Sequence, residues 1–182
     1  YDLDMQIFLY TAAGKCILEG VCDCLRVQIM DIVSKEVRSR MMAGIRSSNT
    51  APEMKVRRLL HRHGFRFRLH QRNLPGKPDV VLARFKVCIF VHGCFWHRHP
   101  NCKYATTPKT REDFWKTKFD HNVERDYRNR DELLRLGWRV IVLWECGIRQ
   151  PESEMAWLLE TISDFNQSYV SWPDFIRPAH FQ

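Results

Sequence analysis

The stretch PDVVLARFKVCIFV, residues 78–91, contains two apolar runs separated by a short connection. The runs predict two strands, residues 79–82 and residues 86–91, joined by a tight turn. The second run is apolar at every position from Val87 to Val91. Such continuity is typical of a strand that is buried on both faces in the middle of a sheet.

Upstream of this stretch, residues 50–64 carry the signals of a complete helix. Thr50 and Glu53 have the spacing of a capping box, and Pro52 falls in the first turn, where its missing N–H costs nothing. Gly64 suits the position just after the last turn. The alternation of residue types that follows, from Phe65 to His70, predicts a half-buried strand.

Downstream, helical periodicity extends from Thr110, the expected N-cap, to Gly137. This length predicts a bend within residues 122–128. A strand is expected over residues 138–144 and a helix over residues 151–165. The order of these elements predicts an α/β fold in which a mixed central sheet is flanked by helices on both faces.

Composition and charge narrow the possible classes. The chain has 182 residues, of which 45% are hydrophobic and 27% charged, as in soluble globular proteins. Its apolar runs are too short to span a membrane. Residues 1–29 have net charge −2, whereas residues 30–182 have net charge +10, from 27 Lys and Arg against 17 Asp and Glu. A compact domain this basic is expected to bind a polyanion such as nucleic acid.

The same boundary divides the predicted domains. Residues 1–29 lack a clear helical or strand period and do not resemble a signal peptide. We therefore predict that they are an N-terminal extension, non-native or disordered. Residues 30–182 are predicted to form a single domain, with Met30 as the native start.

The seven cysteines show no spacing typical of a secreted disulfide framework. We therefore expect the protein to reside in the reducing cytosol. Cys94, His99 and Cys102 lie within nine residues, and Cys146 follows 44 residues later. Four such ligands fit a closed, structural zinc site, provided that the strands preceding Cys94 and Cys146 are neighbours. The alternative is that Cys94 and Cys102 are free thiols and His99 lies on the surface.

A second group of residues suggests hydrolytic chemistry. Asp79 stands at the start of a predicted strand, where its carboxylate can bind a hard cation such as Mg²⁺; alternatively, it closes the turn at residues 76–78. His92 and His97 can transfer protons near neutral pH, or they can serve as scaffold or in the zinc shell.

Three aromatic residues lie in or near the same histidine-rich segment: Phe95, Trp96 and Trp115. Core burial is one interpretation. The other is a wedge that enters the base stack of DNA and opens weakly paired steps.

Four ordered segments carry a family resemblance: LPGKPD (74–79), FVHGCFWHRH (90–99), NVERD (122–126) and GWRVIVLWEC (137–146). Together with residues 38–53, they resemble the very-short-patch repair DNA mismatch endonucleases. The resemblance implies a restriction-endonuclease-like fold of the PD-(D/E)xK type. The usual second acid and lysine of that motif are missing, and Phe90-Val91-His92 stands in their place.

The resemblance also implies the metals and the catalytic roles. Asp79, with the main-chain carbonyl of Val91, would bind Mg²⁺. His97 would activate water and His92 would assist at the phosphate. Two carboxylates would orient water, the metal hydration shell or a histidine; these are Glu53 and Asp126. The implied zinc ligands are Cys94, His99, Cys102 and Cys146.

The implied substrate is double-stranded DNA with a T:G mismatch, which arises when 5-methylcytosine deaminates. One strand would be nicked 5′ to the thymine. Residues implied to intercalate or bind DNA are Met42, Phe95, Trp96, Trp115 and Asn122. The chain would act as a monomer at the nucleoid in the bacterial cytoplasm, with mismatch-repair proteins as candidate partners and no membrane association.

Two alternatives remain open from the sequence. The first is a related PD-(D/E)xK-fold nuclease that acts on another DNA substrate. An enzyme that cuts intact duplex has less use for the three aromatic residues together. The second is a zinc-stabilised DNA-binding module without catalysis. The presence of Asp79, His92 and His97 argues against this alternative, because a module that only binds DNA does not need them.

Overall fold

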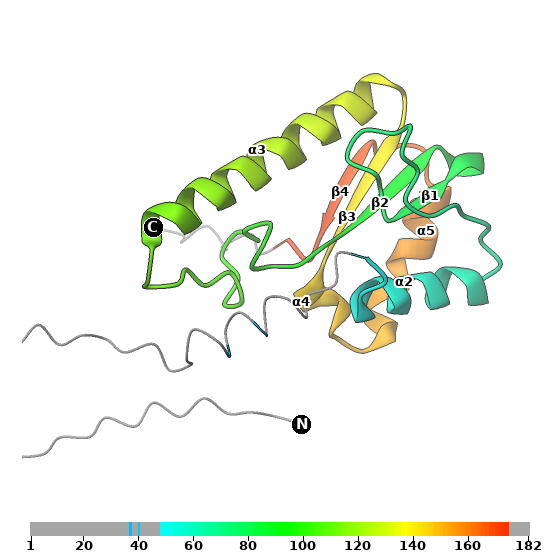
Figure 1. The fold of residues 1–182 in the computed structure, drawn as a ribbon. Coiled ribbons are helices and arrows are strands. Elements are labelled where there is room, and N and C mark those ends of the chain that lie inside the picture. The colour runs from blue at the N-terminus through cyan, green and yellow to red at the C-terminus, as the bar shows by residue number, and fades with distance from the viewer. Residues whose placement is uncertain (1–36, 38–39, 41–47, 175–182) are drawn as a thin grey trace, which may run out of the picture. The chain divides into compact units, whose positions relative to one another are not determined.

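The computed structural model describes residues 37, 40 and 48–174, and its centre is a four-stranded mixed sheet (Figure 1). The strands are β1 (Val80–Leu82), β2 (Val87–His92), β3 (Arg139–Trp144) and β4 (Tyr169–Trp172), in that spatial order. β1 is antiparallel to β2, whereas β2, β3 and β4 are mutually parallel. The prediction of a mixed sheet with residues 86–91 in its interior is confirmed.

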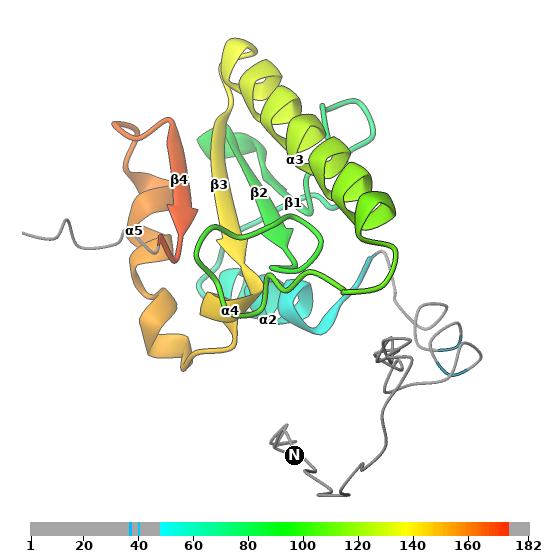
Figure 2. The same ribbon diagram turned by 90° about the vertical axis from the view of Figure 1, so that its left-hand side faces the viewer.

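Helices cover both faces of the sheet, as predicted (Figures 1 and 2). Helix α3 (Glu112–Arg135) lies across one face. Three helices lie on the other: α2 (Ala51–Arg62), α4 (Glu145–Ile148) and α5 (Trp157–Ser163). Because side chains alternate along a strand, Val80 packs with the α2 and α5 layer, whereas its neighbour Val81 packs with the α3 layer.

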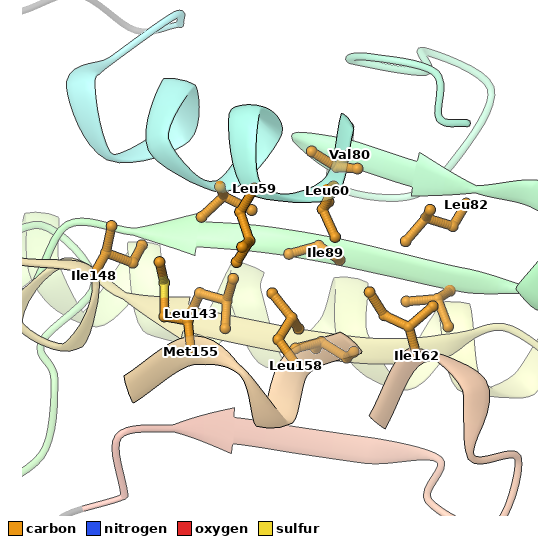
Figure 3. Close-up of a cluster of buried hydrophobic side chains, with 13 residues drawn as sticks. Leu59, Leu60, Val80, Leu82, Ile89, Leu143, Ile148, Met155, Leu158 and Ile162 are labelled. Atoms are coloured by element: carbon orange, nitrogen blue, oxygen red, sulfur yellow. The ribbon is translucent and has the colours of Figure 1, made fainter. Parts of the chain in front are cut away.

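The larger of the two cores lies between the sheet and the α2 and α5 layer (Figure 3). None of its side chains is more than 2% exposed. Burial on this scale fixes α2 against β1 and β2 and thereby positions the residues at the start of α2. The core contains Val56, Leu59, Leu60, Val80, Leu82, Val87, Ile89, Ile141, Leu143, Ile148, Met155, Leu158 and Ile162.

The start and end of α2 match the prediction. The hydroxyl of Thr50 accepts a hydrogen bond from the Glu53 N–H, and the Glu53 carboxylate accepts one from the Thr50 N–H. Pro52 lies in the first turn, and Gly64 follows the helix at φ +79°, a left-handed conformation that favours glycine. The capping box is therefore confirmed.

The strand predicted over residues 65–70 is wrong. Only Arg68 pairs with the sheet, through an isolated bridge to Val81. Its neighbour β1 is three residues long, and His70, at φ +46°, turns the chain away. The alternation nevertheless describes burial correctly, since Phe65 and Phe67 pack against the core.

The predicted start and bend of the long helix are also wrong. Helix α3 begins at Glu112, after Arg111 in a left-handed conformation, so Thr110 is not its N-cap. It continues without a break for 24 residues and is straight (Figure 1). Phe119 and Leu133 are its buried residues, so most of its surface is free of packing that would force a bend.

The C-terminal part differs from the prediction as well. In place of one helix over residues 151–165, there is a 3₁₀ turn (Glu152–Met155) followed by the short α5. Strand β4 was not predicted, because an edge strand of four half-exposed residues carries little periodic signal. No helix of the described part of the chain is long and apolar enough to cross a membrane. The predictions for Met42 and for residues 1–29 lie outside the described residues.

Candidate active site and metal-binding cluster

A cleft of about 920 Å³ opens at the sheet end where β2 terminates, and α2 and α3 both contribute to its wall. All five predicted catalytic side chains line this cleft: Glu53, Asp79, His92, His97 and Asp126. They come from α2, from the residue before β1, from the end of β2, from the following loop and from α3. The fold thus brings together residues separated by up to 73 positions in the sequence.

Asp79 is bound to the neighbouring strand. The Val91 N–H donates a 2.7 Å hydrogen bond to its Oδ2. The adjacent turn is closed by the Lys77 N–H and the Leu74 carbonyl instead, so Asp79 is not needed to close it. Burial raises the pKa of Asp79 to about 6; the hydrogen bond from Val91 opposes this rise, and the negative charge of Glu53 adds to it.

His97 and His92 form a stacked pair beside a carboxylate. Their ring centroids are 4.0 Å apart with planes at 8°. Nδ1 of His97 lies 2.5 Å from a carboxylate oxygen of Asp126, which fixes the ring and leaves Nε2 as the nitrogen for proton exchange. Burial, followed by the nearby His97 and Arg125, lowers the pKa of His92 well below its usual value, so His92 is neutral at neutral pH.

Glu53 is 4% exposed and both of its oxygens have local partners. Oε1 accepts hydrogen bonds from the Thr50 hydroxyl (2.9 Å) and N–H. Oε2 accepts from the Asn49 N–H (3.0 Å) and from Arg57 (2.6 Å). Glu53 therefore acts as a helix cap and an ion-pair partner, and it affects Asp79 through its charge.

The four predicted zinc ligands converge on one point. The ligand atoms of Cys94, His99, Cys102 and Cys146 all lie within 4.8 Å of one another, which is close enough to hold a metal ion. Strands β2 and β3, which precede Cys94 and Cys146, pair along their whole length, as the prediction required. The alternative that His99 lies on the surface is wrong, because it is 3% exposed.

The orientation of His99 suits metal binding. Its Nδ1 lies 3.3 Å from Sγ of Cys146, and its Nε2 lies 2.9 Å from the Pro173 carbonyl. That carbonyl fixes the proton on Nε2, so Nδ1, which faces the thiols of Cys94 and Cys146, is the nitrogen that can bind a metal. Burial raises the pKa of the Cys94 and Cys146 thiols, so metal binding must displace their protons.

Gly147 in α4 allows a close approach of Trp172 and Pro173, the segment whose carbonyl contacts His99. A Cβ at this position would lie 2.4 Å from atoms of Trp172 and of Pro173. Only glycine therefore lets the end of β4 approach α4 closely enough to place the Pro173 carbonyl next to His99.

The aromatic residues predicted as a wedge pack on one another. The ring centroid of Phe95 lies 5.0 Å from that of Trp96 and 5.6 Å from that of Trp115, and all three side chains are half-buried. The ammonium of Lys118 lies 5.2 Å from the Trp96 ring. The predicted DNA-binding residue Asn122 donates a 3.1 Å hydrogen bond to the Trp96 carbonyl and so holds this loop.

Several residues that line the cleft were missed by sequence reasoning: His70, Arg72, Lys77, Arg125 and Asn129. Lys77 and Arg125 lie inside two of the four recognised segments, so their charge next to a proposed acid was an available signal. His70 had no such signal, because its neighbours in space are distant in sequence.

Comparison with known proteins agrees with the resemblance. A family model described as DNA mismatch endonuclease Vsr matches residues 30–103. The type II nicking enzyme V.XorIIP of Xanthomonas oryzae pv. oryzae is 48% identical over 118 residues, 65% of this chain and 86% of that protein. The DNA mismatch endonuclease Vsr of Escherichia coli is 43% identical over 122 residues, 67% of this chain and 78% of that protein.

These matches first define the class of the protein, a DNA endonuclease, since one similar protein is named a DNA mismatch endonuclease and another a type II nicking enzyme. The chain belongs to the family of DNA mismatch endonucleases described as Vsr. The family inferred from the four sequence segments is thereby confirmed.

The partly buried carboxylate of Asp79 gives a testable effect on stability. In the folded chain, the pKa of Asp79 is raised to about 6 from an ordinary 3.8. The contribution of Asp79 to stability is therefore fully present below about pH 4 and is lost as the pH rises through about 6. Asp79→Asn, which keeps an acceptor for the Val91 N–H, should stabilise the magnesium-free protein by about 3 kcal/mol at pH 8 and by about half of that at pH 5.

Urea unfolding at the two pH values measures this difference. Asp120→Asn, at an exposed position of α3, is the control and should change stability by less than about 0.5 kcal/mol. A gain for Asp79→Asn that is the same at pH 5 and pH 8 would show that its cause is not the carboxylate charge.

Proposed function

We propose that this chain nicks one strand of DNA on the 5′ side of the thymine in a T:G mismatch, by Mg²⁺-dependent hydrolysis. The observation that carries the proposal is the meeting of Asp79, His92, His97 and Asp126 on one cleft. Membership of the mismatch endonuclease family supports the endonuclease activity. The V.XorIIP relative, named a nicking enzyme, supports cleavage of a single strand.

The residues at the head of β1 fit a hard divalent cation. Asp79 supplies a partly buried carboxylate that a cation would keep ionised. Val81 exchanges both of its backbone hydrogen bonds with Arg68, so the backbone groups of Val80 point toward β2 and pair with Ile89. By the alternation of an antiparallel pair, the N–H and C=O of Val91 point toward the same side, where Asp79 takes the N–H. This supports the Val91 carbonyl as the second ligand.

The protein groups have distinct roles in the proposed reaction. His97, held by Asp126, accepts a proton from the attacking water. His92 stays neutral and can donate a hydrogen bond to the scissile phosphate. Magnesium, when bound, would neutralise charge on that phosphate. Glu53 orients the surroundings of Asp79. We also assign the chain to the restriction-endonuclease-like PD-(D/E)xK architecture, because the essential acid lies at the head of a strand next to the central strand.

The basic lining of the cleft supports double-stranded DNA as the partner. Arg72, Lys77 and Arg125 surround the proposed catalytic groups and can contact backbone phosphates. One chain supplies every group in this arrangement, so we propose that it acts as a monomer, at the bacterial nucleoid.

A nicking assay tests the proposal directly. Duplexes that differ only in a T:G mismatch or a matched pair are compared, with and without Mg²⁺. We expect cleavage of the mismatched duplex only, 5′ to the thymine and only with the metal. Asp79→Ala and His97→Ala should each slow nicking at least about 100-fold, while DNA binding remains.

Other results have specific meanings. Equal cutting of both duplexes would favour a nuclease with a different DNA substrate. Binding without cutting under any condition would favour a DNA-binding module without catalysis. If both variants still cut, the assignment of Asp79 and His97 is wrong.

We propose that the ion held by Cys94, His99, Cys102 and Cys146 is zinc. Three thiolates and one imidazole match a tetrahedral structural site, and a full set of four leaves no position for a reactant. The ion would tie the loop after β2 to the start of α4, so its binding energy contributes to folding.

Purified protein should contain about one zinc per chain, and Cys146→Ser should lose both the zinc and much of its stability. Elemental analysis and thermal unfolding measure these quantities. The control is Cys88→Ala, which removes a buried thiol outside the cluster and should keep the zinc. Fresh protein without zinc would contradict the proposal.

We further propose that Phe95, Trp96 and Trp115 open the base stack beside the mismatch. Their half-buried rings keep exposed surface next to the cleft, and Trp96 lines it. A mismatched step is easier to unstack than a paired one, so insertion of an aromatic ring favours the mismatch.

Trp96→Ala should therefore lower the ratio of mismatched to matched binding about 10-fold, and change affinity for the matched duplex less than about 2-fold. Fluorescence titration of both duplexes measures the ratio. Tyr104→Ala, which removes an exposed aromatic ring outside the cleft, is the control. An equal loss of affinity for both duplexes would assign Trp96 to packing alone.

A further inference from the structure

His70 links a buried ion pair to the carboxylate at the head of β1. On one side, its Nε2 lies 3.0 Å from a guanidinium nitrogen of Arg57. On the other side, its Nδ1 lies 3.9 Å from Oδ1 of Asp79. The ring lines the same cleft as the proposed catalytic residues.

The contact with Arg57 determines which nitrogen of His70 carries the proton. A guanidinium group has donors and no acceptor, so Nε2 must accept the hydrogen bond. The tautomer that satisfies this hydrogen bond carries its proton on Nδ1, the nitrogen that lies 3.9 Å from Oδ1 of Asp79.

Arg57 is itself held in place. Its side chain is buried, at 6% residue exposure, and its guanidinium donates to Oε2 of Glu53 (2.6 Å) and to the Asn49 side chain (2.6 Å). The same terminal nitrogen serves Glu53 and His70. Glu53, Arg57 and His70 thus form a hydrogen-bonded relay that begins at the start of α2 and ends 3.9 Å from Asp79 at the head of β1.

The backbone conformation of His70 is a second observation that points to a functional role for this residue. Its φ of +46° is in the left-handed region, which is uncommon for residues other than glycine. This conformation follows the isolated bridge at Arg68, and the imidazole lines the cleft. Backbone conformations of this kind are concentrated at functional sites.

We propose that His70 is a positioning residue that orients Asp79 for the divalent cation, and that Glu53 acts through Arg57 and His70 without touching the metal hydration shell. Oδ2 of Asp79 is fixed by the Val91 N–H, so a donor at Oδ1 fixes the carboxylate from both sides. The 3.9 Å separation is beyond hydrogen-bond distance, so the proposal requires this contact to shorten when the cation binds, as polar contacts in unloaded catalytic sites commonly do. This inference rests on the proposed role of Asp79 as a metal ligand.

Metal binding to the full-length, zinc-loaded protein tests the relay independently of cleavage. Mn²⁺ serves as the probe, and electron paramagnetic resonance measures its free concentration. His70→Ala should raise the Mn²⁺ dissociation constant at least 10-fold, as loss of a group that orients a metal ligand typically does. His70→Gln, which retains a donor and an acceptor, should stay within about 3-fold of the unmodified protein. His61→Ala, at an exposed position of α2, is the control and should bind normally.

A double-mutant cycle distinguishes the relay from a direct role of Glu53. Glu53→Gln keeps a side chain that can complete the capping box. If Glu53 acts through His70, the double variant should bind Mn²⁺ within about 2-fold of His70→Ala alone. Multiplied losses would show that Glu53 acts on the metal by a separate route and would overturn that part of the inference.

The remaining outcomes separate the inference from the proposed function. If Asp79→Ala abolishes Mn²⁺ binding and His70→Ala binds as tightly as the unmodified protein, the role of His70 is wrong and the metal site stands. His70→Gln binding as weakly as His70→Ala would also overturn it. If Asp79→Ala binds Mn²⁺ normally, the proposed metal site and the inference both fail.

Discussion

The hydrogen bond from the Val91 N–H to the Asp79 carboxylate joins the fold of this protein to its proposed chemistry. Asp79 lies one residue before β1, and its partner lies near the end of the central strand β2. The register of Val80 opposite Ile89 sets the distance between them. The same burial that brings them together raises the pKa of Asp79 to about 6, which opposes its charge. Because burial disfavours the ionised form of this carboxylate, a bound cation that stabilises its negative charge suits the position well.

The parallel pairing of β2 and β3 places the two candidate sites at one end of the sheet. His92 ends β2 opposite Trp144, which ends β3. The Trp144 ring contacts His92 edge-on, with centroids 5.2 Å apart, and stacks on His99 with centroids 4.3 Å apart. A residue of the proposed active site and a residue of the Cys/His cluster therefore pack on one indole. A change in the position of His99 would therefore move Trp144, and with it His92, in the proposed active site.

What the sequence could predict follows from the range of the interactions involved. Helix α2 was predictable because Thr50, Glu53 and Gly64 act on neighbouring residues. The interior position of β2 was predictable because both of its faces are buried. The missed strand β4 and the wrong strand at residues 65–70 depend on pairing with distant segments, as with Arg68 and Val81. Residue type and position indicated Asp79, His92 and His97 as catalytic candidates, whereas Glu53 and Asp126 came from the family resemblance. The contact between Arg57 and His70 joins folded elements, so no local pattern reports it.

Two groups of side chains lie close enough to hold a metal ion, and their geometry differs. His92, His97 and Asp126 offer three ligand atoms within 4.8 Å, close enough in principle to hold a transition metal. The two imidazole rings, however, are nearly parallel, with planes at 8° and centroids 4.0 Å apart, so their in-plane lone pairs do not aim at one point. Nδ1 of His97 is also occupied by Asp126. In the Cys/His cluster, by contrast, Nδ1 of His99 faces the thiols while Nε2 is held by the Pro173 carbonyl. Stacking and hydrogen bonding therefore make His92 and His97 a poor pair of metal ligands, whereas the Cys/His cluster has a geometry that could hold a metal ion.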